Sequence, residues 1–256
     1  MWERVAPLLP PRPPRRHHYP GRLPSDDRAA LRGIVYVLCK GVSWRDVPAE
    51  RTGCSGVTAW RRLRDWTEAG VWPRLHEVLL AELRVACLLE MDDGSHVRAL
   101  KRGAHTGPSP VDRGRPGSKH HLIVDRHGTP LAVTLTGGNR HDVTQLMPLL
   151  DAIPPVRGLR GRPRRRPRRL FVDRGYDFDK YRRLLRRRGI APRIARRGVA
   201  HGSGLGKIRW VVERTFAWLH QFKRLRIRYE IRADLHHSLL QLACSIICLR
   251  RLRTSF

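Results

Sequence analysis

Lys119-His-His-Leu-Ile-Val-Asp-Arg-His-Gly-Thr-Pro-Leu-Ala-Val-Thr-Leu-Thr136 is the stretch that decides the fold class of this 256-residue chain. Residues 119–125 and the alternating residues 131–136 both have the pattern of β-strands. The segment Asp125-Arg-His-Gly128 between them predicts a short turn. A two-stranded hairpin is therefore expected at the centre of the chain.

Helical and strand patterns extend on both sides of this hairpin. One strand ends ahead of it at Asp93, and the apolar strand Leu170-Phe-Val172 ends at Asp173. A helix capped by Asp142 is expected between them, and helix 179–188, ended by Gly189, precedes a short strand over 191–195. The capped helix carries four apolar positions, Val143, Leu146, Leu149 and Leu150. This order predicts an α/β domain over residues 87–256, the order expected of a ribonuclease H-like core with a mixed sheet flanked by helices.

The first 86 residues divide into two parts. Residues 1–24 are rich in Pro and Arg and are expected to form an extended, solvated arm. Residues 25–86 predict a small helical domain, with helices starting at Ser25, Ser43, Ser55 and Trp72. Its third helix turns Trp60, Leu63 and Trp66 inward and carries three arginines, Arg61, Arg62 and Arg64. A helix-turn-helix module would place these arginines on DNA, whereas a plain helical packing domain would leave them solvated.

Net charge points to a polyanionic partner. The chain holds 52 Lys and Arg against 22 Asp and Glu, a formal charge of +30, which suits electrostatic binding to nucleic acid. Codon bias in a GC-rich genome explains part of the arginine excess. Residues 154–169 contain eight arginines and no apolar pattern, and predict a mobile basic loop that closes on nucleic acid or serves as a solvated linker.

Cysteine usage and hydropathy indicate a cytoplasmic protein, and association with the nucleoid is expected only if the polyanionic partner is DNA. The five cysteines Cys39, Cys54, Cys87, Cys244 and Cys248 lie mostly in apolar stretches and are expected to be buried thiols in a reducing compartment. The longest apolar run, residues 239–249, is too short to span a bilayer, and no signal peptide opens the chain, so no membrane association is expected.

Three acidic residues stand out in this basic chain. Asp93 and Asp173 follow strands, and Glu213 lies on a helix beside an apolar stripe that runs from Ile208 to Phe222. Carboxylates are the ligands that Mg²⁺ prefers, and a pair of such ions serves phosphodiester cleavage. Taken singly, each residue is explained as well by a turn, a cap or a surface ion pair. Arg209 and His220 share the helix edge of Glu213 and are candidates for contact with phosphate.

Several motifs in fixed order resemble a DDE transposase of a bacterial insertion sequence, in family five. They are Asp93-Gly-Ser-His-Val-Arg-Ala, Gly114-Arg-Pro-Gly-Ser-Lys-His-His, Thr136-Gly-Gly-Asn-Arg-His-Asp, Asp173-Arg-Gly-Tyr-Asp and Arg209-Trp-Val-Val-Glu-Arg-Thr-Phe. The resemblance covers nearly the whole chain. It implies a ribonuclease H-like core in which Asp93, Asp173 and Glu213 are the catalytic residues and bind two Mg²⁺ ions, which Mn²⁺ can replace.

The resemblance also implies the DNA partners. Terminal inverted repeats and target DNA are expected substrates, bound by a homodimer that excises and inserts the element. Arg209 matches the arginine before the glutamate, and His220 falls where relatives often carry a lysine. Residues expected to contact DNA are Arg61, Arg62, Arg64, Arg209, His220, Lys223 and Arg224.

Two departures from the family pattern keep alternatives open. The chain starts almost directly at Trp2, and the strand before Asp93 holds Glu90 and Asp92 and looks shortened. Asp92 could therefore replace Asp93 as the first ligand. One alternative function is a catalytically impaired, truncated copy that only binds DNA, and another is a ribonuclease or structure-specific nuclease on the same fold.

Overall fold

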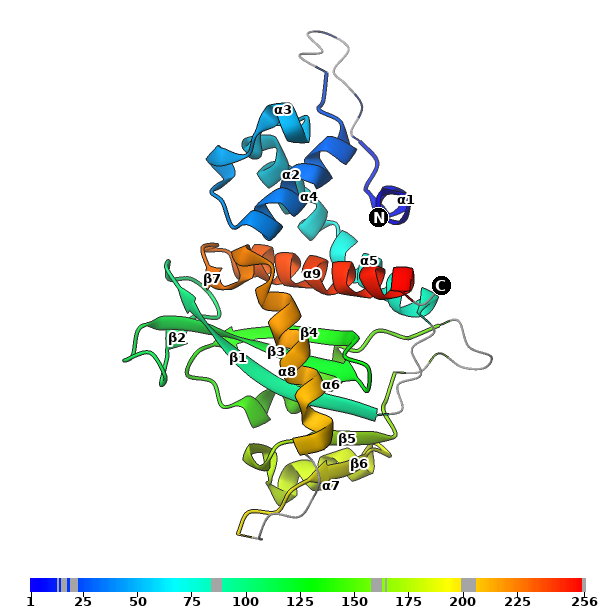
Figure 1. Ribbon diagram of the computed structural model, residues 1–256, viewed down its shortest axis with the longest axis vertical. Coiled ribbons are helices and arrows are strands. Elements are labelled where there is room, and N and C mark those ends of the chain that lie inside the picture. Colours follow the sequence, from blue (N-terminus) through cyan, green and yellow to red (C-terminus); the bar gives the residue numbers. More distant parts are fainter. Residues whose placement is uncertain are drawn as a thin grey trace.

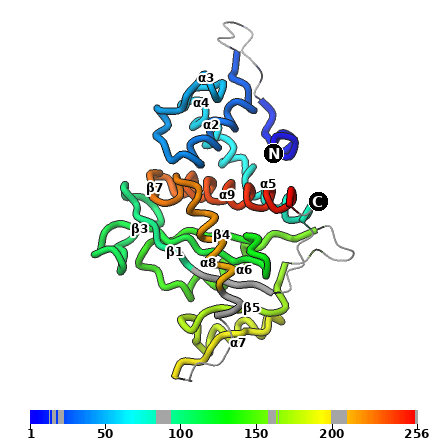
Figure 2. The backbone as a smooth tube through the Cα atoms, in the orientation of Figure 1, coloured from blue at the N-terminus to red at the C-terminus, as the bar shows by residue number. Residues whose placement is uncertain are grey.

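The computed structural model describes residues 1–12, 14, 18, 23–83, 89–157, 163, 165–198 and 206–254, with backbone alone for 89–93 and 206–209. Helices from the N-terminal third lie above a mixed sheet, and the long C-terminal helix α9 (Ala233–Thr254) runs between these two parts (Figure 1). Figure 2 shows that the first and last helices lie near each other, and Met1 and Arg253 line the same cavity.

Capping residues explain where the N-terminal helices begin and end. The Asp26 carboxylate accepts the backbone N–H groups of Arg28 and Ala29 at the start of α2, and Gly41 ends that helix with φ 72°. Ser55 caps α4 in the same way. The helices expected after Ser25, Ser43, Ser55 and Trp72 are confirmed as α2 (Asp27–Lys40), η2 (Trp44–Asp46), α4 (Gly56–Glu68) and α5 (Val71–Glu82), and the short α3 (Ala49–Thr52) is added to them.

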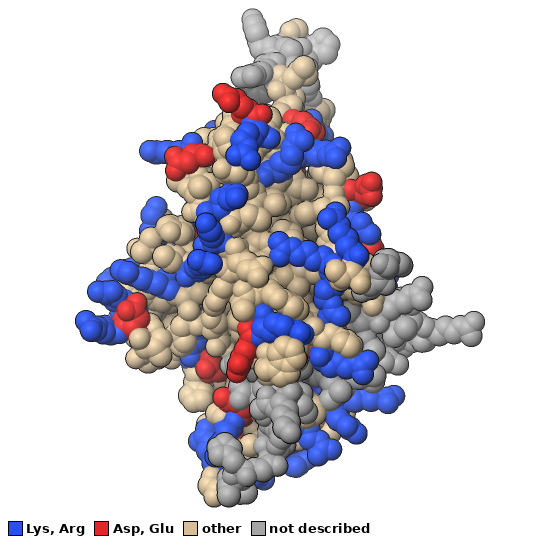
Figure 3. Space-filling model, viewed as in Figure 1, with Lys and Arg blue, Asp and Glu red and all other residues tan. Residues whose placement is uncertain are grey.

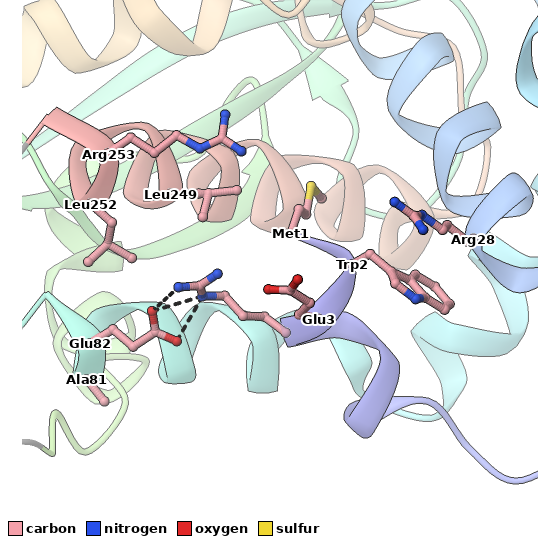
Figure 4. Close-up of a pocket in the computed structure, with 10 residues that line it drawn as sticks. Met1, Trp2, Glu3, Arg28, Ala81, Glu82, Leu249, Leu252 and Arg253 are labelled. Carbon is pink, nitrogen blue, oxygen red and sulfur yellow. Dashed lines mark hydrogen bonds and ion pairs between the residues drawn. The ribbon is translucent and has the colours of Figure 1, made fainter.

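The extended arm predicted for residues 1–24 is wrong for its first part. Trp2–Val5 form α1 and Ala6–Leu8 form η1, and Val5 is fully buried. Arg4 pairs with Glu82 of α5 at 2.7 Å, in the wall of a cavity of about 890 Å³ that α1 shares with the end of α9 (Figure 4). Apolar residues before the first Pro-Pro pair supply a packing face, which outweighs the local Pro content. Residues 13, 15–17 and 19–22 lie outside the described part.

Two kinds of strand pairing meet at β1 (Leu89–Ala99). On one side, β1 pairs antiparallel with β3 (Pro116–Asp125), which pairs antiparallel with β4 (Pro130–Gly137) and with the short β2 (Gly107–Pro108). On the other side, β1 pairs parallel with β5 (Arg169–Val172), and β5 with β6 (Ala191–Ile194). The two-residue β7 (Ile227–Arg228) pairs with the end of β1. The predicted hairpin and the mixed α/β sheet are confirmed.

Helices cover both faces of this sheet. The Ser95 hydroxyl lies 3.5 Å from His220 of α8 (Gly206–His220), whereas a Cβ at neighbouring Gly94 would meet Asp142 at 3.0 Å. Successive residues of a strand face opposite sides, so α8 lies on one face. The other face carries η3 (Asp142–Gln145) and α6 (Leu146–Asp151).

Asp142 does not cap its helix as expected. No side chain caps η3, and Asp142 instead accepts a hydrogen bond from Lys119 Nζ at 2.9 Å. Lys119 is 7% exposed, so its charge needs a nearby carboxylate, which outweighs the small gain from a cap. Beyond β5, η4 (Arg174–Tyr176) and α7 (Asp179–Arg187) complete the predicted order, with η5 (Lys223–Leu225) after α8.

Helix α9 joins the helical part to the sheet in one core. It packs against α5 and α4 on one side and against β4 and α8 on the other, and His76 of α5 bonds the Pro130 carbonyl of β4 at 2.8 Å. Helical and sheet residues form one continuous buried cluster. The predicted boundary near residue 86 falls at 84–88, outside the described residues.

Described cysteines are free thiols, and Cys54, Cys244 and Cys248 are buried as expected, whereas Cys39 is half-buried. Burial raises the pKa of the Cys248 thiol. In the described part of the chain, no helix has the length and apolar character needed to cross a bilayer.

The basic segment 154–169, for which a loop without a core is predicted, contains one buried residue, Val156. Residues 158–162 and 164, which hold much of the predicted mobile loop, are not described.

Candidate active site

The parallel pairing of β1 with β5 brings the first two acidic positions together. Met91 and Phe171 are the last paired residues of this register. Asp93, within β1, and Asp173, directly after β5, each lie two residues beyond this pair, so a continued register would align the two positions. Asp92 has no such relation to Asp173. The register thus favours Asp93 over Asp92 as the partner of Asp173.

Asp93 lies inside its strand, which corrects the expectation that it ends one. β1 continues to Ala99 because β3 pairs with it as far as Arg98 and Gly117, and Asp93 itself lies opposite Leu122. Before Asp93, residues Leu89 to Asp92 already pair in the sheet.

Asp173 stands directly after β5, as expected. Its Oδ1 accepts the backbone N–H of Gly175, which fixes the carboxylate at the start of η4. The side chain is half-buried. A capping role and a ligand role are compatible, because a carboxylate has two oxygens and several lone pairs.

The turn after Asp173 is anchored by a buried ion pair. Asp177 and Arg182 approach to 2.6 Å with side chains 6% and 7% exposed, and Arg182 also donates to the Ile194 carbonyl at 2.9 Å. Burial works to raise the pKa of Asp177, but the backbone N–H of Arg197 and the Arg182 guanidinium together lower it. Arg197 donates to the Gly175 carbonyl at 3.0 Å. These bonds hold the backbone on which Asp173 is mounted.

Glu213 lies on the exposed side of α8. The predicted apolar stripe is confirmed, because Val212, Thr215, Phe216 and Leu219 are buried while Glu213 is exposed. Helix α8 packs against β1, the strand that carries Asp93, and against β3, the strand that pairs with β1. Among side chains that the structure describes, no group of three His, Cys, Asp or Glu could hold a metal, but the Asp93 side chain is outside that set.

Three predicted DNA contacts lie on α8 or just after it: Arg209 near its start, His220 at its end and Lys223 in η5. His220 is half-buried beside Ser95, and burial, followed by the charge of Arg226, lowers its pKa. Lys223 is exposed. Arg209 is in α8, with its side chain outside the described set.

The prediction that Arg224 contacts DNA is wrong. Its side chain is 7% exposed and pairs with buried Glu230 at 2.7 Å. The same guanidinium donates to the Val42 carbonyl at 3.0 Å. Reaching a phosphate would break this buried ion pair, which costs several kcal/mol.

The arginines of α4 differ in how far they are engaged within the protein. Arg61 is exposed. Arg62 lies 2.9 Å from Asp27, and Arg64 lies 2.8 Å from Asp65 and stacks over the Trp60 ring. Arg61 is therefore the most available of the three for a phosphate.

A buried polar chain went unpredicted. His120 on β3 lies 2.9 Å from His236 on α9, and His236 lies 3.2 Å from Glu230, which continues to Arg224. Burial lowers the pKa of His120 well below its ordinary value. In the sequence, the signal for this polar chain is the pair His120-His121 inside an apolar strand. The partner of His120, His236, lies 116 residues away, so the contact itself could not be predicted.

Comparison with known proteins shows the family of the chain. The family model described as Transposase DDE domain matches residues 93–248, and that of the Putative transposase of IS4/5 family matches residues 1–76. On the face shown in Figure 3, Lys and Arg side chains are scattered from top to bottom among uncharged residues, and acidic side chains are fewer.

Two relatives come from Burkholderia cepacia. The "Putative transposase for insertion sequence element IS402" is 65% identical over 148 residues, which cover 58% of this chain and 70% of that protein. The "Insertion element IS402 uncharacterized 16.2 kDa protein" is 54% identical over 114 residues, 43% of this chain and 78% of that protein. A chain in the "Crystal structure of the Mos1 Strand Transfer Complex" aligns over 91% of this chain and 81% of its own length, at 12% identity and a TM-score of 0.35. Since the DDE domain model matches more than half of its residues, the chain belongs to the DDE transposases of insertion sequences.

Proposed function

We propose that this transposase binds the terminal inverted repeats of its element and catalyses metal-dependent cleavage and strand transfer of DNA. The observation that supports the proposal is the parallel register of β1 with β5, whose last pair, Met91 and Phe171, lies two residues before Asp93 and Asp173. Glu213 is on the helix that packs against β1. These three residues are the proposed catalytic and metal-binding set.

The donor set fits divalent ions of the hard type. All three side chains are carboxylates, which Mg²⁺ and Mn²⁺ prefer over nitrogen or sulfur ligands. Two bound Mg²⁺ ions would polarise the scissile phosphate and lower the pKa of water or a 3′-hydroxyl. The protein's own contribution is to hold its carboxylates rigidly, through sheet pairing for Asp93, the Gly175 N–H for Asp173 and the buried face of α8 for Glu213.

The strand order supports a ribonuclease H-like core. Three antiparallel strands in the order β4, β3, β1 are continued by the parallel β5 and β6. Helices occupy both faces, and the candidate carboxylates lie on β1, directly after β5 and on the covering helix α8.

DNA is proposed to lie along the basic surface that joins this site to the helical part. The proposed contacts are Arg61 of α4, Arg209 and Lys223. Arg62 and Arg64 could also bind a phosphate if they leave their present partners, Asp27 and Asp65. Residues 25–86 would act as the helix-turn-helix domain. A homodimer on paired element ends is proposed, because both ends must be cut and joined together.

The structure bears on the alternative of a copy that only binds DNA. That alternative rests on a strand before Asp93 that looks shortened, and residues Leu89 to Asp92 there pair with β3 and β5. The ribonuclease alternative leaves the N-terminal helices without a role. Transposition therefore remains the better supported function.

Cleavage of duplex DNA carrying the inverted repeat, with Mg²⁺, tests the proposal. Glu213→Gln should lower the cleavage rate by more than about a hundredfold, because it removes a metal ligand, while binding of uncut duplex stays within about twofold. Glu50→Gln, an exposed change on α3, is the matched control and should cleave normally. Retained cleavage by Glu213→Gln would refute the assigned role, and binding without cleavage under any divalent metal would favour the DNA-binding alternative.

A further inference from the structure

A groove beside Glu213 combines aromatic rings with arginines. It lies between α8, the end of α9 and the β3–β4 turn, and has a volume of about 610 Å³. We name it the α8–α9 groove, lined by Arg126, Trp210, Arg214, Trp218, Arg250 and Arg251 among others. No acidic residue is among its described lining residues.

Three of these side chains form a stack along α8. The Arg214 guanidinium lies 4.3 Å from the centre of the Trp210 ring and 4.8 Å from that of Trp218. Arg214 also donates to the His127 carbonyl at 2.9 Å, which holds it in place. A spacing of four residues puts all three on one side of the helix. The stack is therefore preformed before any ligand arrives.

Trp210 lies at one end of this stack, and its ring is partly exposed to solvent. It is 49% exposed, although a buried site is usual for so large an apolar ring. Arg214 covers one part of the ring, and the remainder faces solvent at the mouth of the groove. Exposed aromatic rings next to cations are the elements from which single-stranded nucleic acid sites are built, because every base has a π-face to stack.

Charge complementarity selects the occupant. Arg126 and Arg250 are exposed at the groove, and Arg251 is balanced by Asp125 at 3.6 Å. The groove thus offers positive charge for a phosphate backbone beside a stacking surface for a base. Inside a duplex both faces of a base are covered by its neighbours, so a ring at Trp210 can take an internal base only where the strand is unpaired.

We propose that the α8–α9 groove binds an unpaired segment of the DNA strand, with one base stacked on Trp210. Trp210 lies three residues before Glu213, so the stacked base would belong to the nucleotides next to the cleavage position. Binding there would hold the strand end apart from the duplex. The inference rests on the proposed action on DNA.

The test uses the full chain in EDTA with a short oligo-dT that carries one 5-iodouracil. Irradiation should crosslink it to the peptide that contains Trp210, located by mass spectrometry. At elevated salt, which suppresses phosphate-driven binding, Trp210→Ala should weaken binding at least about fivefold. Trp210→Phe should retain most of the affinity because the ring remains.

Matched controls make the result decisive. Ile231→Ala removes an apolar side chain that is also about half exposed, at 56%, but lies outside the groove, and it should bind normally. A blunt duplex of the same sequence should not crosslink to Trp210. Crosslinks at other residues alone, equal crosslinking of the duplex, or unchanged affinity of Trp210→Ala would each overturn the inference. Because no metal or cleavage is involved, its failure is separable from loss of the catalytic assignment.

Discussion

Acid should weaken the junction between α5 and the sheet through His76. This side chain is 5% exposed and bonds the Pro130 carbonyl of β4 at 2.8 Å. Burial lowers its pKa from 6.5 to about 4, although the bond to Pro130 works in the opposite direction. Folding therefore requires a neutral His76 at a point where the helical part meets the sheet.

The sign and size of the effect follow from this depressed pKa. Below pH 6.5 the unfolded chain takes up a proton that the folded chain refuses, so stability falls as the pH drops from 6.5 towards 4. The full shift in the pKa of His76 corresponds to a loss of about 3 kcal/mol in the free energy of unfolding, at about 1.36 kcal/mol for each pKa unit. About 2 kcal/mol of this is already lost at pH 5.

Urea unfolding at about pH 7 and pH 5 measures the effect against His76→Gln. Glutamine does not titrate, and its amide can still donate to the Pro130 carbonyl. The free energy of unfolding of the unaltered chain should fall by about 2 kcal/mol more than that of the variant. Other buried histidines, such as His120 and His121, titrate in both proteins and cancel in the comparison. Equal losses in the two proteins would refute the reasoning.

Two further substitutions probe how the site and the helical part are held. Asp177→Ala should lower the free energy of unfolding by about 3 kcal/mol, because it leaves buried Arg182 without its carboxylate, and urea unfolding checks this. Cleavage should fall as well, since the Asp173 turn loses its anchor, whereas a stable variant with normal cleavage would contradict the role. Gly56→Ala would place a Cβ 1.6 Å from the Trp44 carbonyl oxygen, so η2 must move. We expect a loss of about 1–3 kcal/mol, seen as a lower Tm, and an unchanged Tm would contradict the close approach.

Local signals explain the parts of the fold that could be predicted. The Ser55 cap, the left-handed Gly41 and the turn before Gly128 act within a few residues and can be recognised without tertiary contacts. Predictions failed where distant segments supply the stabilising contact. Val5 is helical because α5 covers it, and Asp142 turns from a cap to a partner of Lys119 because that lysine is buried.

Residue chemistry was determined by the sequence alone: three carboxylates in a chain of charge +30, the hairpin, the helix of Glu213 and the family to which they belong. Tertiary structure alone decided which of these residues come together. A parallel register between strands about 80 residues apart aligns the strand that carries Asp93 with the strand that precedes Asp173, and Arg224 is held in the interior by Glu230 and the Val42 carbonyl. Long-range pairing and burial are collective effects, so a residue's type shows what it can bind, whereas the packed chain decides what it meets.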